Sequence, residues 1–372
     1  MRGPAVRPIV IAAGGTGGHM FPAEALAAEL IARGRRIVLM TDSRSAGLQS
    51  HVFGGKEQYV IRGAGLAGRG IPRAGAAMVS LLAGTVQARQ ILGGLGAVAV
   101  VGFGGYPSVA PVSATWFMPR RPAVILHEQN AVLGRANRFL AKRADRLALS
   151  FAATTRVAPG TSTIVTGNPV RPAIASLDQA GYAAAGEKVR LLVLGGSLGA
   201  RVFSNVVPAA LTQLPQWLRA RVVVTQQCRS EDLQHVRSAY GSAGINAELS
   251  AFFPDVGARL VAAHLVIARA GASTVAELAV VGRPAVLVPL PGAIDDHQSA
   301  NARALADAGG AWVMPQPTFT PGALSARLME LFTAPTVLTR AAVGSRSVAQ
   351  PHAAARLADL VEAVTPQEAV HP

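Results

Sequence analysis

The most constraining feature of this 372-residue sequence is a pattern that occurs twice, about half a chain apart. An apolar, β-branched run at 8–13 leads into a glycine-rich turn, GGTGGH, at 14–19. A second apolar run at 189–194 leads into GGSLGA at 195–200. A short apolar strand, a glycine turn and a helix are typical of a parallel sheet that is covered on both faces. The repeat therefore predicts an α/β fold with two similar domains.

Other apolar runs extend this pattern through both halves of the chain. We expect further strands at 37–40, 97–101, 123–126, 221–225, 265–268 and 285–288. The first helix is predicted to begin near Pro22 and to end at Gly34, and an alanine-rich helix is predicted at 343–364. The length also exceeds the ~250–300 residues at which a single core stops growing. We expect domains at 1–168 and 169–342, followed by a C-terminal helix and tail at 343–372.

Cysteine usage and hydropathy exclude several classes of protein. A single cysteine, Cys228, excludes an internal disulfide framework and a cysteine-based zinc cluster, and it suits a reducing compartment. No secretory signal is expected, because the apolar run near the N-terminus ends at Gly14 without a cleavage pattern. Residues 91–119 carry no charge, but glycines and prolines interrupt them. A strand, a loop and a short helix fit this stretch better than a membrane span.

The net charge of +15 is concentrated in the first half of the chain. Residues 1–170 hold 19 Lys and Arg against 6 Asp and Glu, which gives +13, and the remaining 16 against 14 give +2. An anionic partner is therefore expected to meet the first half: a phosphorylated substrate, an anionic lipid or a nucleic acid. A generally basic proteome is the alternative explanation.

The first glycine-rich turn suits a phosphate group. Glycines let the backbone approach a ligand, and the N–H groups at the start of the following helix attract anions. The spacing differs from the G-x-G-x-x-G dinucleotide fingerprint, but Asp42 lies where a ribose-binding acid would lie, which keeps a nicotinamide-binding alternative open. His19 is a candidate general base or phosphate ligand, and the alternative is a histidine that only hydrogen-bonds locally at a helix start.

Three more polar or glycine-rich segments follow apolar runs in the first half. They are GFGGYPS at 102–108, HEQN at 127–130 and GNPVR at 167–171. Parallel sheets place ligands at the carboxyl ends of their strands, so each segment is a candidate ligand loop. Four consecutive polar side chains in HEQN favour a functional role, and Arg171 has the geometry to hold a phosphate. Purely structural turns are the alternative.

The second half carries two further candidate segments. In RAGASTVAE at 269–277, Glu277 is predicted either to accept the hydroxyls of a ribose or to form a capping box with Thr274. In DDHQSANA at 295–302, the dense polar group suits recognition of sugar hydroxyls. The spacing of Asp295, Asp296 and His297 matches no metal motif, so a metal is not expected there.

Taken together, these seven segments closely resemble the MurG family of glycosyltransferases, in the family's order and across nearly the whole chain. The resemblance implies two Rossmann-like domains that face each other across a cleft, the GT-B type, with the last helix packing back toward the N-terminal domain. It also implies an inverting transfer of N-acetylglucosamine from UDP-N-acetylglucosamine to the 4-hydroxyl of the muramyl sugar of lipid I, which forms lipid II for peptidoglycan.

The resemblance also assigns roles to individual residues. His19 is expected to be the general base or a ligand of the acceptor phosphate. The expected donor-binding residues are Thr16, Gly17, Gly18, Asn130, Arg171, Ser197, Phe253 through its backbone, Ala272, Ser273, Thr274, Glu277, His297 and Gln298. The expected acceptor-pyrophosphate residues are Gly14, Gly15, Gly104, Gly105, Tyr106 and Ser108. No cofactor and no metal are expected, since UDP-N-acetylglucosamine is a substrate.

The implied partners are undecaprenyl-linked lipid I and the anionic inner membrane surface, with the enzyme peripheral on its cytoplasmic face; cell-wall synthesis proteins are further candidates. Apolar residues beside arginines at 66–92 suggest a membrane patch. Its candidate members are Leu66, Ile71, Met78, Leu81, Leu82, Arg69, Arg73 and Arg89, with Trp116, Phe117, Met118, Arg120 and Arg121 as an extension. An amphipathic helix that faces the core is the alternative.

Three rival functions remain. One is a transferase of the same fold that acts on another lipid acceptor. A second is the nicotinamide-dependent oxidoreductase, which leaves the second glycine turn and Glu277 without a role. A third, nucleic-acid binding, is disfavoured because aromatic residues make up only 5% of the chain and no binding module is evident.

Overall fold

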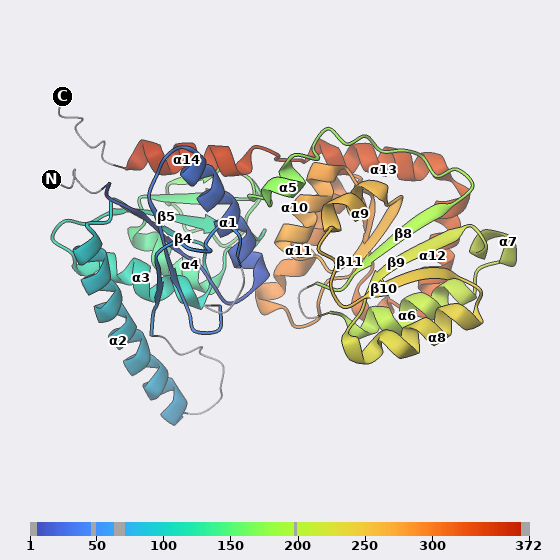
Figure 1. The fold of residues 1–372 in the computed structure, drawn as a ribbon, viewed down its shortest axis with the longest axis horizontal. Coiled ribbons are helices and arrows are strands. Elements are labelled where there is room, and N and C mark those ends of the chain that lie inside the picture. The colour runs from blue at the N-terminus through green and yellow to red at the C-terminus, as the bar shows by residue number, and fades with distance from the viewer. Residues whose placement is uncertain (1–5, 46–49, 63–70, 197–198, 366–372) are drawn as a thin grey trace. The chain divides into compact units, whose positions relative to one another are not determined.

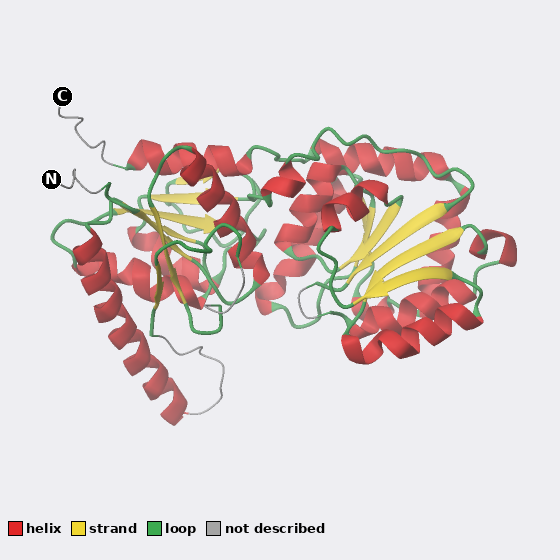
Figure 2. Ribbon diagram, viewed as in Figure 1, coloured by secondary structure: helices red, strands yellow, loops and turns green. Residues whose placement is uncertain are grey.

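The computed structural model of the chain describes residues 6–45, 50–62, 71–196 and 199–365. They form two compact units, of which the first takes in residues up to Pro172 and from His352 on, and the second is Ala173–Pro351. Each unit is a parallel sheet flanked by helices (Figures 1 and 2). The predicted α/β fold with two Rossmann-like domains is confirmed.

The first unit contains a seven-stranded sheet in the order β3-β2-β1-β4-β5-β6-β7, with every neighbouring pair parallel. Because the chain order changes direction between β1 and β4, the loops after these two strands flank the position where α/β sheets bind ligands. The strands are β1 Ile9–Ala12, β2 Ile37–Thr41, β3 Gln58–Val60, β4 Ala99–Gly102, β5 Ala123–Glu128, β6 Arg146–Leu149 and β7 Thr163–Val165.

Helices cover both faces of this sheet. Alternate residues of β1 point to opposite faces: Ile11 packs in a core with α1 and α14, and Val10 packs in a second core with α2 and α3. The helices are α1 Gly17–Ala32, α2 Ile71–Leu95, α3 Val109–Ala114, α4 Arg135–Leu140 and α14 Ala353–Val364, with 3₁₀ turns at Tyr106–Ser108, Thr115–Phe117 and Ala141–Arg143.

The start of α1 differs from the prediction. The helix begins at Gly17 rather than near Pro22, and the Thr16 carbonyl accepts hydrogen bonds from the N–H groups of His19 and Met20. The prediction treated Pro22 as a first-turn residue, but it lies in the second turn of α1, inside the helix, where it lacks the N–H for one intrahelical hydrogen bond. His19 therefore belongs to the first turn of α1.

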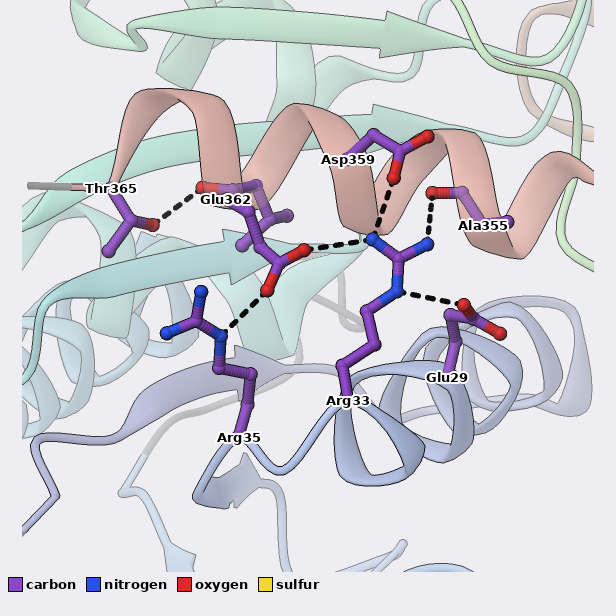
Figure 3. Close-up of polar contacts among 8 residues, drawn as sticks. Glu29, Arg33, Arg35, Ala355, Asp359, Glu362 and Thr365 are labelled. Carbon is purple, nitrogen blue, oxygen red and sulfur yellow. Dashed lines mark hydrogen bonds and ion pairs between the residues drawn. The ribbon is translucent and has the colours of Figure 1, made fainter. Parts of the chain in front are cut away.

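The C-terminal helix α14 belongs to the first unit, although the chain reaches it from the second. Its apolar face, with Leu357 and Val361, is buried in the core beneath α1. At its outer edge, Arg33, which follows the last residue of α1, is 2.6 Å from Asp359 and 2.8 Å from Glu362 (Figure 3). The predicted single helix at 343–364 is wrong: α13 ends at Ser347 and α14 begins at Ala353, because Pro351 cannot continue the helical hydrogen bonding.

The second unit contains a six-stranded parallel sheet in the order β10-β9-β8-β11-β12-β13, the same arrangement as the first six strands of the other unit. The strands are β8 Val189–Leu194, β9 Val222–Gln227, β10 Asn246–Ser250, β11 Leu265–Ala268, β12 Ala285–Leu287 and β13 Ala311–Val313. The α-helices are α5 Pro172–Ala175 at the passage between units, α6 Arg201–Thr212, α7 Gln216–Arg219, α8 Leu233–Ser242, α9 Val256–Ala262, α10 Ala272–Val281, α11 His297–Asp307, α12 Pro321–Thr333 and α13 Pro335–Ser347. The 3₁₀ turns are Ser230–Asp232, Ile294–Asp296 and Gln316–Thr318.

The uncharged stretch at 91–119 folds as predicted. It contains the end of α2, then β4, a 3₁₀ turn and α3. Among the residues that the structure describes, no helix is both long enough and apolar enough to cross a membrane.

Candidate functional site

The first glycine-rich turn lies at the carboxyl end of β1, as expected for a ligand loop. Gly14 is buried, and a Cβ atom placed on it would lie 2.8 Å from Thr41 Oγ1, so a larger residue would displace its neighbours. Gly15 has a left-handed φ of +84°, and its N–H donates to Ser45 Oγ at 2.6 Å. Both glycines are therefore required by the backbone of the turn itself.

The first turn of α1 presents Thr16, Gly17, Gly18 and His19 together. In the described structure no side chain caps this helix start, so its backbone N–H groups are available to an anionic ligand. His19 is partly exposed, and its Nδ1 lies 3.5 Å from Thr16 Oγ1. A Cβ atom on Gly105 would lie only 3.1 Å from the His19 ring. The loop after β4 therefore backs the candidate catalytic histidine.

That loop combines two glycines in a left-handed backbone conformation with two buried hydroxyls. Gly104 and Gly105 have left-handed φ values of +74° and +65°. Burial raises the pKa of Tyr106, whose hydroxyl has no hydrogen-bond partner among the described residues. Ser108 is fully buried and donates to the carbonyls of Ala12 and Gly104 at 2.9 and 2.8 Å. The predicted contact of Ser108 with a pyrophosphate does not fit this burial; its hydroxyl holds the loop in place.

His127 at the end of β5 is held in one neutral form. Gln129 Nε2 donates to both the His127 carbonyl and His127 Nδ1, so the ring proton is on Nε2, which donates to the Gly167 carbonyl at 3.0 Å. Complete burial lowers the pKa of His127 to about 4. His127 is therefore neutral near pH 7 and anchors the segment that carries Arg171.

Glu128 is buried beside it, and its carboxylate accepts four hydrogen bonds. Oε1 accepts from the backbone N–H and the side-chain amide of Asn130, both at 3.0 Å. Oε2 accepts from the N–H of Gly134 at 2.9 Å and from Asn137 Nδ2 at 3.0 Å. Sequence reasoning singled out Asn130 but missed Asn137, which lies nine positions from Glu128 on α4.

Arg171 contacts the first turns of α1 through Phe21. Its guanidinium carbon lies 4.9 Å from the centre of the Phe21 ring, one turn after the glycine-rich segment. Neighbouring Asn168 is buried, and neither polar atom of its side chain has a hydrogen-bond partner in the described part of the chain. The first unit thus gathers the segments at 14–19, 102–108, 127–130 and 167–171 at one edge of its sheet.

In the second unit, the turn after β11 leads into α10, and the first backbone N–H groups of this helix have no side-chain cap in the described structure. Gly271 is the N-cap residue, so Ala272, Ser273 and Thr274 form the first turn, and no side chain caps it in the described structure. Ser273 Oγ is buried without a hydrogen-bond partner among the described residues. The capping-box alternative for Glu277 is wrong, because Thr274 is already the third helical residue. Glu277 is buried on the second turn of the same helix.

The start of α11 lies close to that turn. Asn301 is buried and donates to the Ala270 carbonyl at 3.2 Å, which fastens α11 beside the start of α10. His297 Nδ1 is 2.7 Å from the Ile294 carbonyl, so Nδ1 carries the proton and Nε2 has its lone pair available as an acceptor. Gln298 Oε1 accepts from the Leu290 N–H at 2.9 Å. The structure therefore brings the 269–277 and 295–302 segments together.

Two donor-binding predictions remain to be placed. Ser197 lies outside the described residues. Phe253, three residues after the end of β10, is buried, and the Arg259 guanidinium lies 4.0 Å from its ring centre. The backbone role predicted for Phe253 remains a proposal that is compatible with this position.

Asp42 does not support the nicotinamide alternative. It is buried, and its carboxylate accepts from the Ser45 N–H and from Arg44 Nε, each at 3.1 Å. Burial acts to raise the Asp42 pKa, but the hydrogen bonds from Ser45 and Arg44 outweigh it and the pKa is lowered. The carboxylate is occupied within its own loop. Among the described His, Cys, Asp and Glu residues, no group of three or more is arranged to hold a metal ion.

The predicted membrane patch is only partly exposed. Met78, Val79, Leu82 and Val86 of α2 and Phe117 are each more than half exposed. We call these five residues the α2 patch. Leu81, Trp116 and Met118 instead pack against the core, and Arg121 is paired with Asp145. Leu66 and Arg69 lie outside the described residues, as do the side chains of Ile71 and Arg73.

Family models match both halves of the chain. The N-terminal domain of glycosyltransferase family 28 matches residues 9–149, and its C-terminal domain matches residues 190–360. The two Rossmann-like units, with glycine-rich turns at the carboxyl ends of their strands, are those of a glycosyltransferase of the GT-B type.

Individual relatives narrow this class. The chain is 60% identical over 363 residues to the UDP-N-acetylglucosamine–N-acetylmuramyl-(pentapeptide) pyrophosphoryl-undecaprenol N-acetylglucosamine transferase of Granulibacter bethesdensis, over 97% of this chain and 94% of that protein. It is 55% identical to the protein of the same name from Acidiphilium cryptum, over 97% and 98%. The crystal structure of Acinetobacter baumannii MurG matches with a TM-score of 0.78 and 31% identity, over 96% of this chain and 99% of that one. The chain belongs to the MurG family, which confirms the resemblance drawn from the seven segments.

Proposed function

We propose that this enzyme transfers N-acetylglucosamine from UDP-N-acetylglucosamine to the 4-hydroxyl of the muramyl sugar of lipid I, with inversion at the anomeric carbon, and so forms lipid II. The observation that carries the proposal is the near full-length match to the Granulibacter bethesdensis transferase, whose name states these substrates. The geometry supports it most clearly at α10, where an uncapped helix start and the Ser273 hydroxyl offer donors to an anion.

The donor site is proposed to lie mainly in the second unit. The first turn of α10, with Ala272, Ser273 and Thr274, is placed to hold the diphosphate, and Glu277 on the next turn is placed to accept the ribose hydroxyls. His297 Nε2 and the Gln298 amide, beside that turn, are proposed to read the hydroxyls of the sugar. Ser197 and the backbone at Phe253 complete the proposal for the donor phosphate and the uracil. Thr16, Gly17, Gly18, Asn130 and Arg171 are proposed as donor contacts from the first unit.

The acceptor site is proposed to lie at the carboxyl edge of the first sheet. Gly14, Gly15, Gly104, Gly105 and Tyr106 surround the start of α1, where a pyrophosphate would meet backbone N–H groups. His19 stands beside them as the proposed general base or acceptor-phosphate ligand. Its Nδ1 lies 3.5 Å from Thr16 Oγ1, and with the ring proton on Nδ1 the basic nitrogen is Nε2.

The proposed chemistry is a single displacement. The acceptor 4-oxygen forms a bond to the anomeric carbon of N-acetylglucosamine while the bond from that carbon to the UDP oxygen breaks. The hydroxyl proton passes to His19, and UDP leaves with the electron pair of the broken bond. Negative charge develops on the leaving diphosphate, where the N–H groups at α10 and the Ser273 hydroxyl are positioned to stabilise it.

The membrane surface is the proposed setting of the reaction, because lipid I is a membrane lipid. Met78, Leu82 and Val86 recur every four residues of α2 and so share one helix face. Figure 1 shows the first turns of α2 extending beyond the sheet of its unit. We propose that the α2 patch enters the anionic cytoplasmic face of the inner membrane as a peripheral contact. Cell-wall synthesis proteins remain candidate partners.

The test is transfer of labelled N-acetylglucosamine from its UDP donor to a short-chain lipid I analogue. Wild type is compared with Glu277→Ala and with Glu330→Ala, which removes an exposed carboxylate of the same unit from a surface ion pair. We expect transfer by wild type and Glu330→Ala, and a loss of roughly 10- to 100-fold in kcat/KM for Glu277→Ala, because a hydrogen bond to a charged group contributes about 1.5–3 kcal/mol.

Each departure from this result has a distinct meaning. Donor binding without transfer would redirect the proposal to another lipid acceptor. No binding of UDP-N-acetylglucosamine would overturn the proposed reaction. Equal activity of Glu277→Ala and Glu330→Ala would remove Glu277 from the donor site and leave the reaction standing.

A further inference from the structure

The buried carboxylate of Glu128 stands between two segments that the proposed function assigns to different substrates. It is 2% exposed, at the carboxyl end of β5, within the motif HEQN. A carboxylate in the middle of a candidate active site is an obvious candidate for a general base. Its surroundings decide whether it is available for that role.

The hydrogen bonds of Glu128 occupy the whole of its carboxylate. A carboxylate offers about four lone-pair sites, two on each oxygen. Here Oε1 and Oε2 each accept two N–H donors, at distances of 2.9–3.0 Å. Protonation would remove one acceptor site and leave a buried donor facing another donor, which is costly.

The first carboxylate oxygen of Glu128, Oε1, holds the residue that is proposed to contact the sugar donor. Oε1 holds both the backbone N–H and the side-chain amide of Asn130. One of these bonds holds the backbone of Asn130 and the other holds its side-chain amide, and Asn130 is proposed to contact the sugar donor from the first unit.

The second oxygen, Oε2, holds Asn137, which contacts the loop that is proposed to meet the sugar acceptor. Asn137 Nδ2 donates to Glu128 Oε2 at 3.0 Å and to the His127 carbonyl at 3.1 Å. A Cβ atom on Gly104 would lie 3.0 Å from that same Nδ2, so the backbone of the β4 loop rests directly on the Asn137 amide. The next residue of the loop, Gly105, lies against the His19 ring.

We propose that Glu128 is a positioning residue whose carboxylate fixes Asn130 for the sugar donor and, through Asn137, fixes the Gly104 loop that backs His19 and meets the sugar acceptor. The proposal rests on the proposed function for the identity of the two substrates. It does not rest on that function for the linkage itself, which consists of contacts inside the first unit.

The decisive variant is Glu128→Gln, which keeps the size of the side chain but replaces one acceptor oxygen by an NH₂ donor. That donor then faces N–H groups it cannot bond, so either Asn130 or Asn137 must move. The matched control is Ser150→Ala. Ser150 Oγ donates to the Glu128 carbonyl at 2.8 Å, so this control removes a buried hydrogen bond from the same residue and leaves the carboxylate intact. Asn137→Ala removes only the link from Glu128 through Asn137 to the Gly104 loop.

Two measurements are made on these variants. The first is amide hydrogen exchange of peptides covering 102–108 and 130–137, which needs no substrate. We expect faster exchange in both segments for Glu128→Gln, in 102–108 for Asn137→Ala, and in neither for Ser150→Ala. The second is steady-state kinetics with a pH profile. For Glu128→Gln we expect kcat/KM to fall roughly 10- to 100-fold with a higher KM for both substrates, because charged hydrogen bonds are lost. The acid limb of the profile is expected to keep its position.

The outcomes separate this proposal from the proposed function. Wild-type exchange rates in Glu128→Gln, or equal effects of Glu128→Gln and Ser150→Ala, would overturn the positioning role even when the wild type transfers sugar normally. Loss of the acid limb in Glu128→Gln would make Glu128 a proton acceptor and would also overturn it. A wild type that transfers nothing would overturn the proposed function, while the exchange data would still decide the role of Glu128. Should Glu128→Gln not fold, Asn137→Ala decides: a raised KM for the acceptor alone supports the linkage, and an unchanged one contradicts it.

Discussion

At the scale of single residues, two histidines show how their neighbours set different roles. His127 is completely buried, with both ring nitrogens engaged by Gly167 and Gln129. His297 is partly exposed, and within the described part of the chain only its Nδ1 is engaged, by the Ile294 carbonyl. The first is therefore expected to influence stability, and the second is expected to influence ligand binding.

His127 predicts an acid-sensitive contribution to stability. Its pKa is about 4 in the folded chain against an ordinary value of 6.5, so the unfolded chain binds the extra proton between these values. The contribution of neutral His127 to the free energy of unfolding is fully present above about pH 6.5 and is lost as the pH falls towards 4. Between about pH 7.5 and pH 5 we expect wild type to lose about 2 kcal/mol more than His127→Gln, which has no such proton. Thermal midpoints at the two pH values check this, and equal decreases in both proteins would contradict it.

His297 predicts selective loss of sugar recognition. In His297→Asn the amide replaces the Nδ1 hydrogen bond to the Ile294 carbonyl, but no Nε2 acceptor remains. We expect roughly fivefold weaker binding of UDP-N-acetylglucosamine, since a single hydrogen bond contributes about 1 kcal/mol, and unchanged binding of UDP. Calorimetry with both ligands is the measurement. Equal weakening of the two would show that His297 supports the fold of the donor site rather than the sugar.

At the scale of elements, α14 is held by two kinds of interaction of unequal size. Its apolar side chains are buried in the core beneath α1, whereas Arg33 bonds Glu29, Asp359, Glu362 and the Ala355 carbonyl at a partly exposed edge (Figure 3). Truncating a buried leucine costs about 2–5 kcal/mol, and exposed ion pairs contribute about 0–1 kcal/mol each. The buried apolar side chains are thus expected to provide most of the free energy that holds α14 in place. The ion pairs are expected to change only how often the helix opens locally.

This difference predicts a graded response in α14. Hydrogen exchange of residues 353–364 is expected to rise strongly in Leu357→Ala, moderately in Arg33→Ala and least in Arg35→Ala, which loses one ion pair with Glu362. Added salt is expected to shrink the effect of Arg33→Ala and to leave that of Leu357→Ala unchanged, because salt screens charges. An Arg33→Ala effect as large as that of Leu357→Ala would contradict this order.

The α2 patch predicts a membrane effect that is separate from catalysis. Placing glutamate at Leu82 and Val86 puts charge on the face proposed to enter the membrane. We expect at least roughly tenfold weaker binding to vesicles of anionic phospholipid, because each buried side chain contributes about 1.5–3 kcal/mol. Activity on a water-soluble acceptor analogue is expected to stay unchanged. Val343→Glu, at an equally exposed valine of α13, is the control. Equal vesicle binding by both variants would move the membrane contact elsewhere.

At the scale of the whole molecule, the sequence predicted the interior of each unit better than its edges. Strand β1 is buried throughout and reads as a continuous apolar run, and β8 is apolar except for the exposed Arg190. The strands that were not predicted include β3 and β10, short edge strands with exposed or polar residues. Pairing with one neighbour in the folded sheet, rather than their own composition, makes them strands.

The candidate site was predictable where a motif is local. Glycine turns and polar strand ends could be read directly, and so could the resemblance they carry. The four donors around Glu128 could not, because the turns at 130–137 bring them to the carboxylate only in the folded unit. The Thr274 and Glu277 pattern misled for the opposite reason: the helix begins three residues earlier than the local spacing implies.

The most direct test of the central claim is the linkage formed by the wild-type enzyme. The product made from UDP-N-acetylglucosamine and a lipid I analogue is isolated, and its glycosidic bond is read by NMR. We predict one N-acetylglucosamine, β-linked to the 4-hydroxyl of the muramyl sugar, because inversion converts the α-linked donor to a β-linked product. An α-linkage, a different hydroxyl or no transfer at all would contradict the account.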